Sequence, residues 1–231
     1  MNYIRKADER GKVDLGWLQS NHSFSFGHYY DPKHMGVSVL RVINDDVVMP
    51  AEGFGTHGHR DMEIISYVLE GALEHHDSTG NTYVINAGEV QRMSAGSGIT
   101  HSEYNASKTA KVNFLQIWIK PRINGIKPGY EQKKIEQGGA LTTLVTPNGT
   151  GDSLTINQDM SLYRLKLSAG ESYELAAGNR LGYFHIVSGY ISVKENNFGN
   201  GDAFSVDSGE SVLIEAKEDL EALWFDLPKV N

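Results

Sequence analysis

Apolar and polar residues alternate along most of the 231-residue chain, whereas apolar residues at helical spacing are scarce. Glycine, asparagine and aspartate interrupt the alternation at short intervals, as they do in turns between strands. The pattern therefore predicts an all-β protein built from many short strands. In the first half of the chain we expect strands at Val37–Ile43, Met62–Leu69, Ala72–Asp77, Thr82–Ile85, Val90–Met93 and Val112–Ile119.

The composition loosens near the middle of the chain, which indicates a domain boundary. Gly138-Gly139 and the stretch 147–152 are rich in glycine and polar residues. The segment 128–137 before them fits either a short helix or a crossover strand. We therefore predict two domains, 1–135 and 136–231. Strands are expected in the second domain at Tyr163–Leu167, Gly182–Val187, Tyr190–Lys194, Ser211–Glu215 and Glu221–Asp226.

The two halves show a faint internal repeat. The string from Tyr67 to Gly71 resembles the string from His185 to Gly189. A duplicated series of short strands is typical of two packed small barrels or sandwiches. The second copy has no pair of histidines two residues apart, so we expect it to be structural and free of metal.

Composition and charge exclude several classes of protein. The chain has no cysteine, which excludes disulfides and thiol chemistry, and its net charge of -8 disfavours nucleic-acid binding. No run of 18 apolar residues predicts a membrane span, and the N-terminus does not resemble a signal peptide. We therefore expect a cytoplasmic protein that contacts neither membranes nor nucleic acids directly.

Two short strings carry side chains that bind metals. His57-Gly-His59 and His101-Ser-Glu103 each place two ligand side chains two residues apart. In an extended strand, such residues point to the same face of the sheet. The sequence therefore predicts that three imidazoles and one carboxylate surround one metal ion.

The types of ligand restrict the metal and its use. Imidazole suits Fe, Co, Ni, Cu and Zn, whereas Ca and Mg prefer sites made only of oxygen. Four protein ligands leave open positions in an octahedral sphere, as a catalytic metal requires. Gly53, Gly55 and Gly58 around the first pair indicate bends and close approach of backbone segments.

The motifs around these ligands resemble those of the cupins and, more narrowly, of the pirin family. The string from Gly55 to Glu63 contains the first histidine pair, and the string from Met93 to Glu103 contains the second pair. The segment from His22 to Phe26 also resembles the pirins, most closely the bacterial members with quercetinase activity. The likeness is specific from Tyr3 to about Tyr130 and weaker beyond.

This resemblance implies a bicupin, which consists of two cupin-type β-barrels packed together. It places the metal ligands on His57, His59, His101 and Glu103 of the N-terminal barrel. It implies one divalent metal, iron(II) in the first place, with Mn, Co, Ni, Cu or Zn as alternatives. Glu63, at the position that ordinary cupins use as a ligand, is not a ligand in the pirins.

The activity that the resemblance implies is quercetin 2,3-dioxygenase, with a flavonol and O2 as substrates. We expect Glu103 to accept the proton of the flavonol 3-hydroxyl, after which O2 opens the ring and carbon monoxide leaves. One alternative is a metal- or redox-dependent binding protein that regulates a protein partner. A cupin isomerase or lyase is the other, because family membership alone does not fix function.

Other histidines and aromatic residues are expected to be structural. His75 and His76 are adjacent in a strand, so only one of them can face the barrel interior, and we expect it to form hydrogen bonds rather than bind metal. His22 and the aromatic residues that follow it are expected to pack against the barrel. Trp118 is expected to lie in the core or at an interface.

Overall fold

The computed structural model describes residues 1 and 3–229 and divides into two compact units. The N-terminal unit comprises residues 11–135 and 154–158, and the C-terminal unit comprises residues 1–10, 136–153 and those from 159 onward. The predicted domains, 1–135 and 136–231, assign the segments 1–10 and 154–158 differently. Composition gives no sign that residues 1–10 belong to the C-terminal unit, because β1 pairs with β20, far along the chain.

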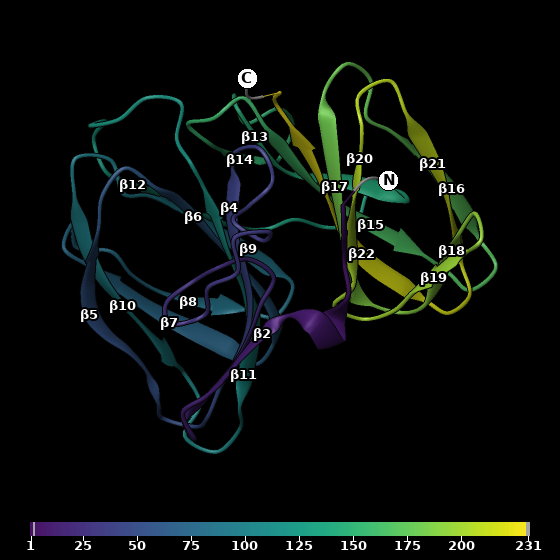
Figure 1. The fold of residues 1–231 in the computed structure, drawn as a ribbon. Coiled ribbons are helices and arrows are strands. Elements are labelled where there is room, and N and C mark those ends of the chain that lie inside the picture. Colours follow the sequence, from purple (N-terminus) through teal and green to yellow (C-terminus); the bar gives the residue numbers. More distant parts are fainter. Residues whose placement is uncertain (2, 230–231) are drawn as a thin grey trace. The chain divides into compact units, whose positions relative to one another are not determined.

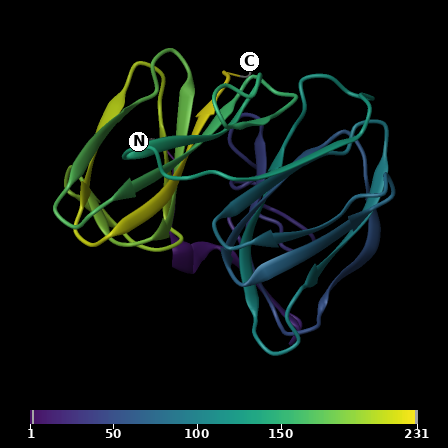
Figure 2. The same ribbon diagram turned by 180° about the vertical axis from the view of Figure 1, so that it is seen from behind.

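Both units consist almost entirely of strands, which confirms the all-β prediction (Figures 1 and 2). The N-terminal unit contains β2 (Gly11–Asp14), β3 (Leu18–His22), β4 (Leu40–Val48), β5 (Gly53–His59), β6 (Glu63–Glu70), β7 (Ala72–Asp77), β8 (Thr82–Asn86), β9 (Glu89–Ser94), β10 (Ile99–Asn105), β11 (Val112–Ile119), β12 (Gly129–Lys134) and β14 (Leu154–Thr155). The C-terminal unit contains β1 (Ile4–Arg5), the 3-10 turn η1 (Ala7–Glu9), β13 (Leu141–Thr146), β15 (Ser161–Leu167), β16 (Ser172–Ala176), β17 (Leu181–Ser188), β18 (Ile191–Val193), β19 (Asn196–Phe198), β20 (Ala203–Val206), β21 (Ser211–Ala216) and β22 (Leu220–Leu227).

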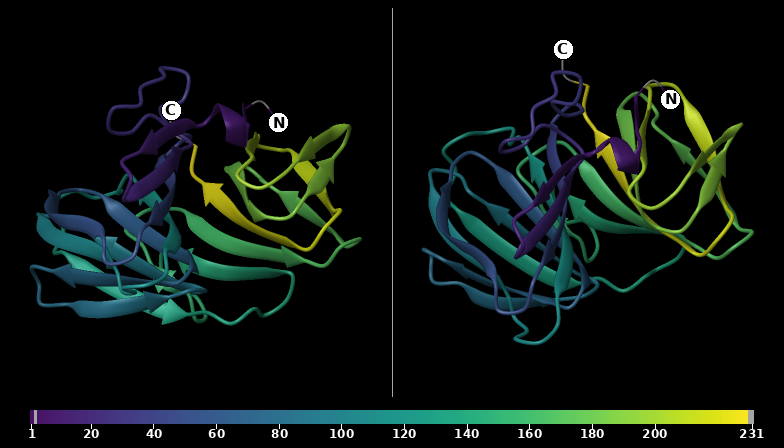
Figure 3. Two further views of the ribbon diagram at one scale, coloured as in Figure 1. Left: turned by 90° about the horizontal axis from the view of Figure 1, so that it is seen from below. Right: turned by 60° about the horizontal axis from the view of Figure 1, so that its bottom comes forward.

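Strand order shows that the two units are copies of one fold. In the N-terminal unit a large sheet runs β12-β9-β6-β11-β4-β3-β2 and a small sheet runs β5-β10-β7-β8. In the C-terminal unit the large sheet includes β1-β20-β17-β22-β15-β13 and the small sheet runs β16-β21-β18-β19. Each unit is thus a barrel made of two sheets, and the chain is a bicupin (Figure 3).

Glycines at matching turns show the same duplication. Gly71 follows β6 and Gly189 follows β17, with φ of 78° and 101° respectively. A Cβ on Gly71 would lie 2.8 Å from the carbonyl oxygen of Lys111, and a Cβ on Gly189 would lie 2.4 Å from that of Asp219. Only glycine tolerates both the positive φ and the close carbonyl. The repeat seen in the sequence therefore reflects a shared backbone constraint.

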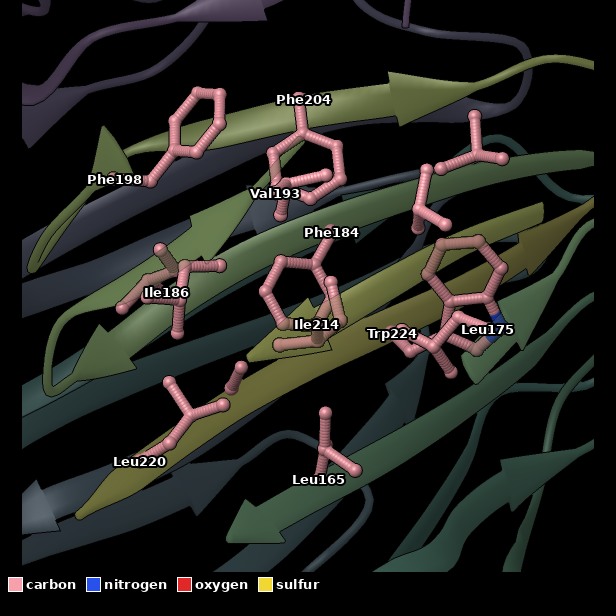
Figure 4. Packing of buried hydrophobic residues seen from close by; sticks show 14 of the residues in the cluster. Leu165, Leu175, Phe184, Ile186, Val193, Phe198, Phe204, Ile214, Leu220 and Trp224 are labelled. Atoms are coloured by element: carbon pink, nitrogen blue, oxygen red, sulfur yellow. The ribbon is translucent and has the colours of Figure 1, made fainter. Parts of the chain in front are cut away.

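The interiors of the two barrels differ in polarity. An apolar cluster fills the C-terminal barrel with residues from both of its sheets, among them Phe184, Phe204 and Trp224 (Figure 4). In the N-terminal barrel, Val68, Leu73 and other apolar residues form a smaller cluster. Buried histidine, glutamate and glutamine side chains occupy much of the remaining interior. The N-terminal barrel therefore holds the polar interior in which a ligand site can form.

The expected strands did not include β5 and β10, which contain the paired ligand residues. The observed strands also decide one open alternative and correct one predicted end. The segment 128–137 contains the strand β12, so the strand alternative holds rather than the helix. We predicted that a strand would end at Ile43, but β4 continues through Asn44-Asp45-Asp46 to Val48. Asn and Asp are typical of turns, which is why the alternation seemed to end there. No helix of the described residues is long and apolar enough to cross a membrane.

Candidate metal centre

Three imidazoles converge inside the N-terminal barrel. His57 and His59 lie on one face of β5, and His101 lies opposite His57 in the antiparallel neighbour β10. Nε2 of His101 lies 3.1 Å from Nε2 of His57 and 3.0 Å from Nε2 of His59. The alternation of side chains along paired strands accounts for this convergence.

The spacing of these nitrogens suits a metal ion. Two nitrogens that each lie about 2.1 Å from one ion and subtend a right angle are about 3.0 Å apart. The Nε2 distances of 3.0 and 3.1 Å thus fit His101 as a ligand adjacent to both His57 and His59 around one ion. The arrangement leaves positions for further ligands.

Burial keeps two of these imidazoles uncharged at neutral pH. Burial, followed by the charges of His101 and His57, lowers the pKa of His59 to about 4. Burial, followed by the charges of His57 and His75, lowers the pKa of His101 to about 3. A neutral imidazole has a free lone pair, which metal binding requires.

Glu103 is held rigidly beside this group. Its carboxylate is buried and accepts hydrogen bonds from Gln91 Nε2 at 3.0 Å on Oε1 and from Gln116 Nε2 at 2.7 Å on Oε2. The hydroxyl of Ser66 lies 3.2 Å from Oε1 as well. Oε1 therefore has two neighbouring donors and Oε2 has one.

The predicted ligands belong to two overlapping clusters. His57, His59 and His101 form one group whose ligand atoms lie within 4.8 Å of one another, and His75, His101 and Glu103 form the other. His101 is common to both. Among the described residues, no such group contains all four predicted ligands.

Glu63 and Asn105 have structural roles in this barrel. The carboxylate of Glu63 accepts a hydrogen bond from Ser94 Oγ at 2.7 Å. The side chain of Asn105 donates to the carbonyl oxygens of Val48 and Ala110 and so holds a loop. Neither side chain reaches the imidazole group by a hydrogen bond that the structure shows.

A pocket opens beside the imidazoles, with about 430 Å³ of empty space that includes open solvent at its mouth. His57, His59 and Glu103 line it. Aromatic rings form one part of the wall, and Trp118 makes edge-to-face contacts with His59 at 5.0 Å and with Phe26 at 5.1 Å between ring centroids. The expectation that Trp118 lies in the core or at an interface misses this contact with the pocket.

Polar side chains of β4 and β11 form another part of the wall. Asn44 and Asp46 alternate on the inner face of β4, and Gln116 comes from the neighbouring strand. The Oδ1 atoms of Asn44 and Asp46 have no hydrogen-bond partner within the described part of the chain. Burial raises the pKa of Asp46 to about 7, and the charges of Asp45 and Glu103 act in the same direction.

Sequence reasoning did not single out this polar wall. Asn44 and Asp46 stand two residues apart between apolar residues, with the same spacing as the histidine pair. Such spacing indicates one shared face of a strand, and it could have identified them.

Comparison with known proteins agrees with this architecture. Residues 3–119 match the family model described as pirin, and residues 143–227 match the quercetinase C-terminal cupin domain. The chain is 47% identical over 232 residues to a quercetin 2,3-dioxygenase of Escherichia coli (strain K12), with 100% of both chains covered. It is 40% identical to a putative quercetin 2,3-dioxygenase of Pasteurella multocida, with 97% of this chain and 98% of the relative covered.

A solved structure of similar fold contains a metal. The bacterial pirin YhhW from Escherichia coli, in complex with nickel(II), superimposes with a TM-score of 0.94 at 46% identity and covers 99% of both chains. This similarity and the imidazole cluster together support one divalent metal in the present chain.

Proposed function

The chain belongs to the pirin family, and from this membership we propose that it is a metal-dependent quercetin 2,3-dioxygenase that opens the flavonol ring with O2 and releases carbon monoxide. The observation that supports this most is that two imidazoles of the cluster, His57 and His59, line a pocket with aromatic walls. Flat aromatic substrates fit such walls, and a few polar groups then fix their orientation.

His57, His59, His101 and Glu103 are the proposed metal ligands. A bound divalent metal would supply a Lewis acid that lowers the pKa of a hydroxyl group and promotes reaction with O2. Iron(II) is our first assignment, and nickel(II), which the related pirin structure contains, is the first alternative.

Glu103 is the proposed base for the 3-hydroxyl of the flavonol. It lines the pocket, and its Oε2 accepts only the hydrogen bond from Gln116 among the described residues. Oε2 therefore has one remaining lone pair, whereas two donors surround Oε1. That lone pair would bind the metal, and it could accept the incoming proton only when Glu103 leaves the metal. Gln91 and Gln116 keep the carboxylate in place while it is charged.

Asn44 and Asp46 are the proposed contacts for further hydroxyl groups of the substrate. Their Oδ1 atoms lack a partner in the described structure and belong to residues that line the pocket. A buried acceptor without a partner is costly, so a phenolic hydroxyl that donates to it gains binding energy. A polyhydroxylated flavonol such as quercetin provides several such donors.

The test is turnover of quercetin by the purified full chain. Metal is removed with a chelator, the chain is reloaded separately with Fe(II), Ni(II), Mn(II), Co(II) and Cu(II), and O2 uptake and carbon monoxide are recorded. The proposal predicts equal amounts of O2 consumed and carbon monoxide released with at least one metal. The absence of O2 uptake with every metal and with several flavonols would exclude it.

A further inference from the structure

His75 lies against the side of His101 that faces away from the other two imidazoles. Nδ1 of His75 is 3.5 Å from Nδ1 of His101, whereas Nε2 of His101 points to His57 and His59. The side chain of His75 is fully buried in β7. In the strand pairing, Glu103 lies opposite His75, so the two strands place His75 directly beside the proposed ligands.

The other nitrogen of His75 contacts a carboxylate that can only accept hydrogen bonds. Nε2 of His75 lies 3.0 Å from Oδ2 of Asp77. Oδ2 also accepts a hydrogen bond from Asn81 Nδ2 at 2.9 Å, and Oδ1 accepts one from the backbone N–H of Thr79 at 2.8 Å and one from its hydroxyl at 2.7 Å. These donors favour the ionised form of Asp77, which has no proton to donate.

Because Asp77 can only accept, it determines which ring nitrogens of His75 and His101 carry a proton. Because Asp77 accepts, Nε2 of His75 carries its proton and Nδ1 of a neutral His75 has the lone pair. That lone pair can accept only if Nδ1 of His101 carries a proton. Nε2 of His101 then has its lone pair directed at His57 and His59, which is the tautomer that a metal requires.

We propose that Asp77 and His75 are positioning residues that fix His101 in the Nε2-ligand tautomer through a chain of two hydrogen bonds. This inference rests on the metal site of the proposed function and adds two residues that act on it indirectly. Neither residue contacts the metal or the substrate.

Aromatic packing holds the His75 ring in the orientation that the two hydrogen bonds need. Tyr130 from β12 packs on His75 at 4.7 Å between ring centroids, and Tyr83 from β8 stacks on Tyr130 at 5.1 Å with an angle of 11°. A ring packed on a flat partner cannot rotate freely about χ2. The ring therefore keeps Nδ1 toward His101 and Nε2 toward Asp77.

The distances favour this role over metal binding by His75. A metal bound by His75 through Nδ1 would need Nδ1 of His101 as its second ligand, because these are the atoms that face each other. Nε2 of His101, which lies 3.0 and 3.1 Å from two other imidazole nitrogens, would then be unused. The cluster of three Nε2 atoms is the better metal site.

The substitution Asp77→Asn should reverse the chain of hydrogen bonds. Oδ1 of Asp77 accepts from two groups of Thr79, so the amide oxygen of the variant should stay there and its NH2 group should face His75. Nε2 of His75 would then accept, its Nδ1 would donate to His101, and Nε2 of His101 would hold the proton. That tautomer cannot bind a metal until the proton leaves.

The first measurement is the tautomer of each imidazole in the metal-free full chain, from 15N chemical shifts of histidine-labelled protein. We expect protons on Nδ1 of His101 and on Nε2 of His75 in the parent, and the opposite pattern in Asp77→Asn. A parent protein with the proton on Nε2 of His101 would overturn the proposal, whether or not any variant folds.

The second measurement is the affinity for Ni(II), from competition with a chelator. We expect Asp77→Asn and His75→Leu to weaken binding about 10- to 100-fold. His75→Asn should restore much of the loss, because its amide oxygen can accept from Nδ1 of His101. His76→Asn is the matched control, since His76 is exposed in the same strand and bonds to Thr82.

Unchanged Ni(II) affinity in folded Asp77→Asn and His75→Leu would contradict the proposal. Equal losses in His75→Asn and His75→Leu would show a packing role instead of a hydrogen bond, and would contradict it as well. Both measurements are independent of turnover. If the chain does not turn over quercetin, the tautomers and the Ni(II) affinity still test the role of His75 and Asp77. If that role is wrong, quercetin turnover still tests the dioxygenase proposal.

Discussion

At the scale of single residues, the proposed function assigns the proton transfer to one carboxylate, that of Glu103. Glu103 is buried, lies beside the imidazoles and has hydrogen-bond donors on both oxygens. Glu103→Gln preserves shape and an oxygen ligand but removes the charge and the ability to accept a proton. We expect this variant to bind metal more weakly than the parent, but the three histidines should still retain part of the metal.

Quercetin turnover per bound metal should fall about 10²- to 10⁴-fold in Glu103→Gln, the usual contribution of one general base. Turnover rates corrected for metal content measure this directly. Glu74→Gln, which changes a partly exposed carboxylate of β7, is the control and should leave turnover unchanged. If corrected turnover of Glu103→Gln stays within a few fold of the parent, another group is the base.

Asp46 should make the metal-free protein less stable as pH rises. Its pKa is raised by burial from 3.8 to about 7, so between these values the folded chain keeps a proton that the unfolded chain has released. Raising the pH through this window therefore favours unfolding, by about 2–4 kcal/mol for this group.

Urea unfolding of metal-free protein at several pH values between 4 and 8 tests this effect of Asp46. Asp46→Asn should remove that part of the pH dependence, whereas Asp45→Asn, on the opposite face of β4, should keep most of it. A parallel pH dependence in Asp46→Asn and the parent would show that Asp46 titrates near its usual value.

At the scale of elements, the site depends on the close approach of β5 and β10. A Cβ on Gly53 would lie 2.4 Å from the carbonyl oxygen of Glu103, and the pairing is irregular between His101 and Glu103. Gly55 lies on the same strand, and the nearest atom to its added Cβ would be Tyr104 Oη at 3.8 Å. The glycines near the first histidine pair thus differ, and the close backbone approach expected from the sequence occurs at Gly53.

Gly53→Ala should push β5 away from β10 and separate His57 from His101. We expect a loss of about 1–3 kcal/mol in the free energy of unfolding, together with weaker Ni(II) binding. Gly55→Ala is the matched control and should change both quantities little. Urea unfolding and chelator competition measure them, and equal behaviour of the two variants would refute the role of Gly53.

The elements also show what the sequence could predict and what it could not. The predicted strand Met62–Leu69 corresponds to β6, because both of its ends are marked by changes in polarity. The predicted end of β4 at Ile43 was wrong. Asn44 and Asp46 are residue types typical of turns, but here they lie within the strand and line a polar pocket. The pairing of β5 with β10 and the position of His75 beside His101 depend on register, which periodicity does not specify.

At the scale of the whole molecule, one fold occurs twice with opposite interiors. Register relates the layer of Ser66, Gln91 and Gln116 in the N-terminal barrel to Phe184, Phe204 and Trp224 in the C-terminal barrel. The polar layer supports the carboxylate of Glu103, whereas the aromatic layer fills the equivalent space. A Cβ on Gly182 would overlap the ring of Trp224 at 1.8 Å, so that glycine makes room for the indole.

The same register places apolar residues at the positions that correspond to the proposed metal site. His57, His101 and Glu103 correspond to Leu175, Val212 and Ile214. Even His75 corresponds to an apolar residue, Val193. These substitutions give a physical reason for the proposal that the C-terminal barrel is structural.

We therefore predict one tightly bound metal ion per chain. Elemental analysis should show loss of most of this metal in His57→Ala and in His101→Ala, because an ion that lacks one ligand dissociates readily. His185→Asn, which alters the buried histidine of the C-terminal barrel, should leave metal content unchanged. Two ions in the parent, one of which survives His57→Ala, would contradict the assignment.

The most direct test of the whole account is quercetin turnover measured while metal is returned to the stripped full chain. We predict that carbon monoxide release rises in proportion to bound metal and stops rising at one ion per chain. Release that is the same with and without metal, or that continues to rise beyond one ion per chain, would contradict a single metal-dependent site in the N-terminal barrel.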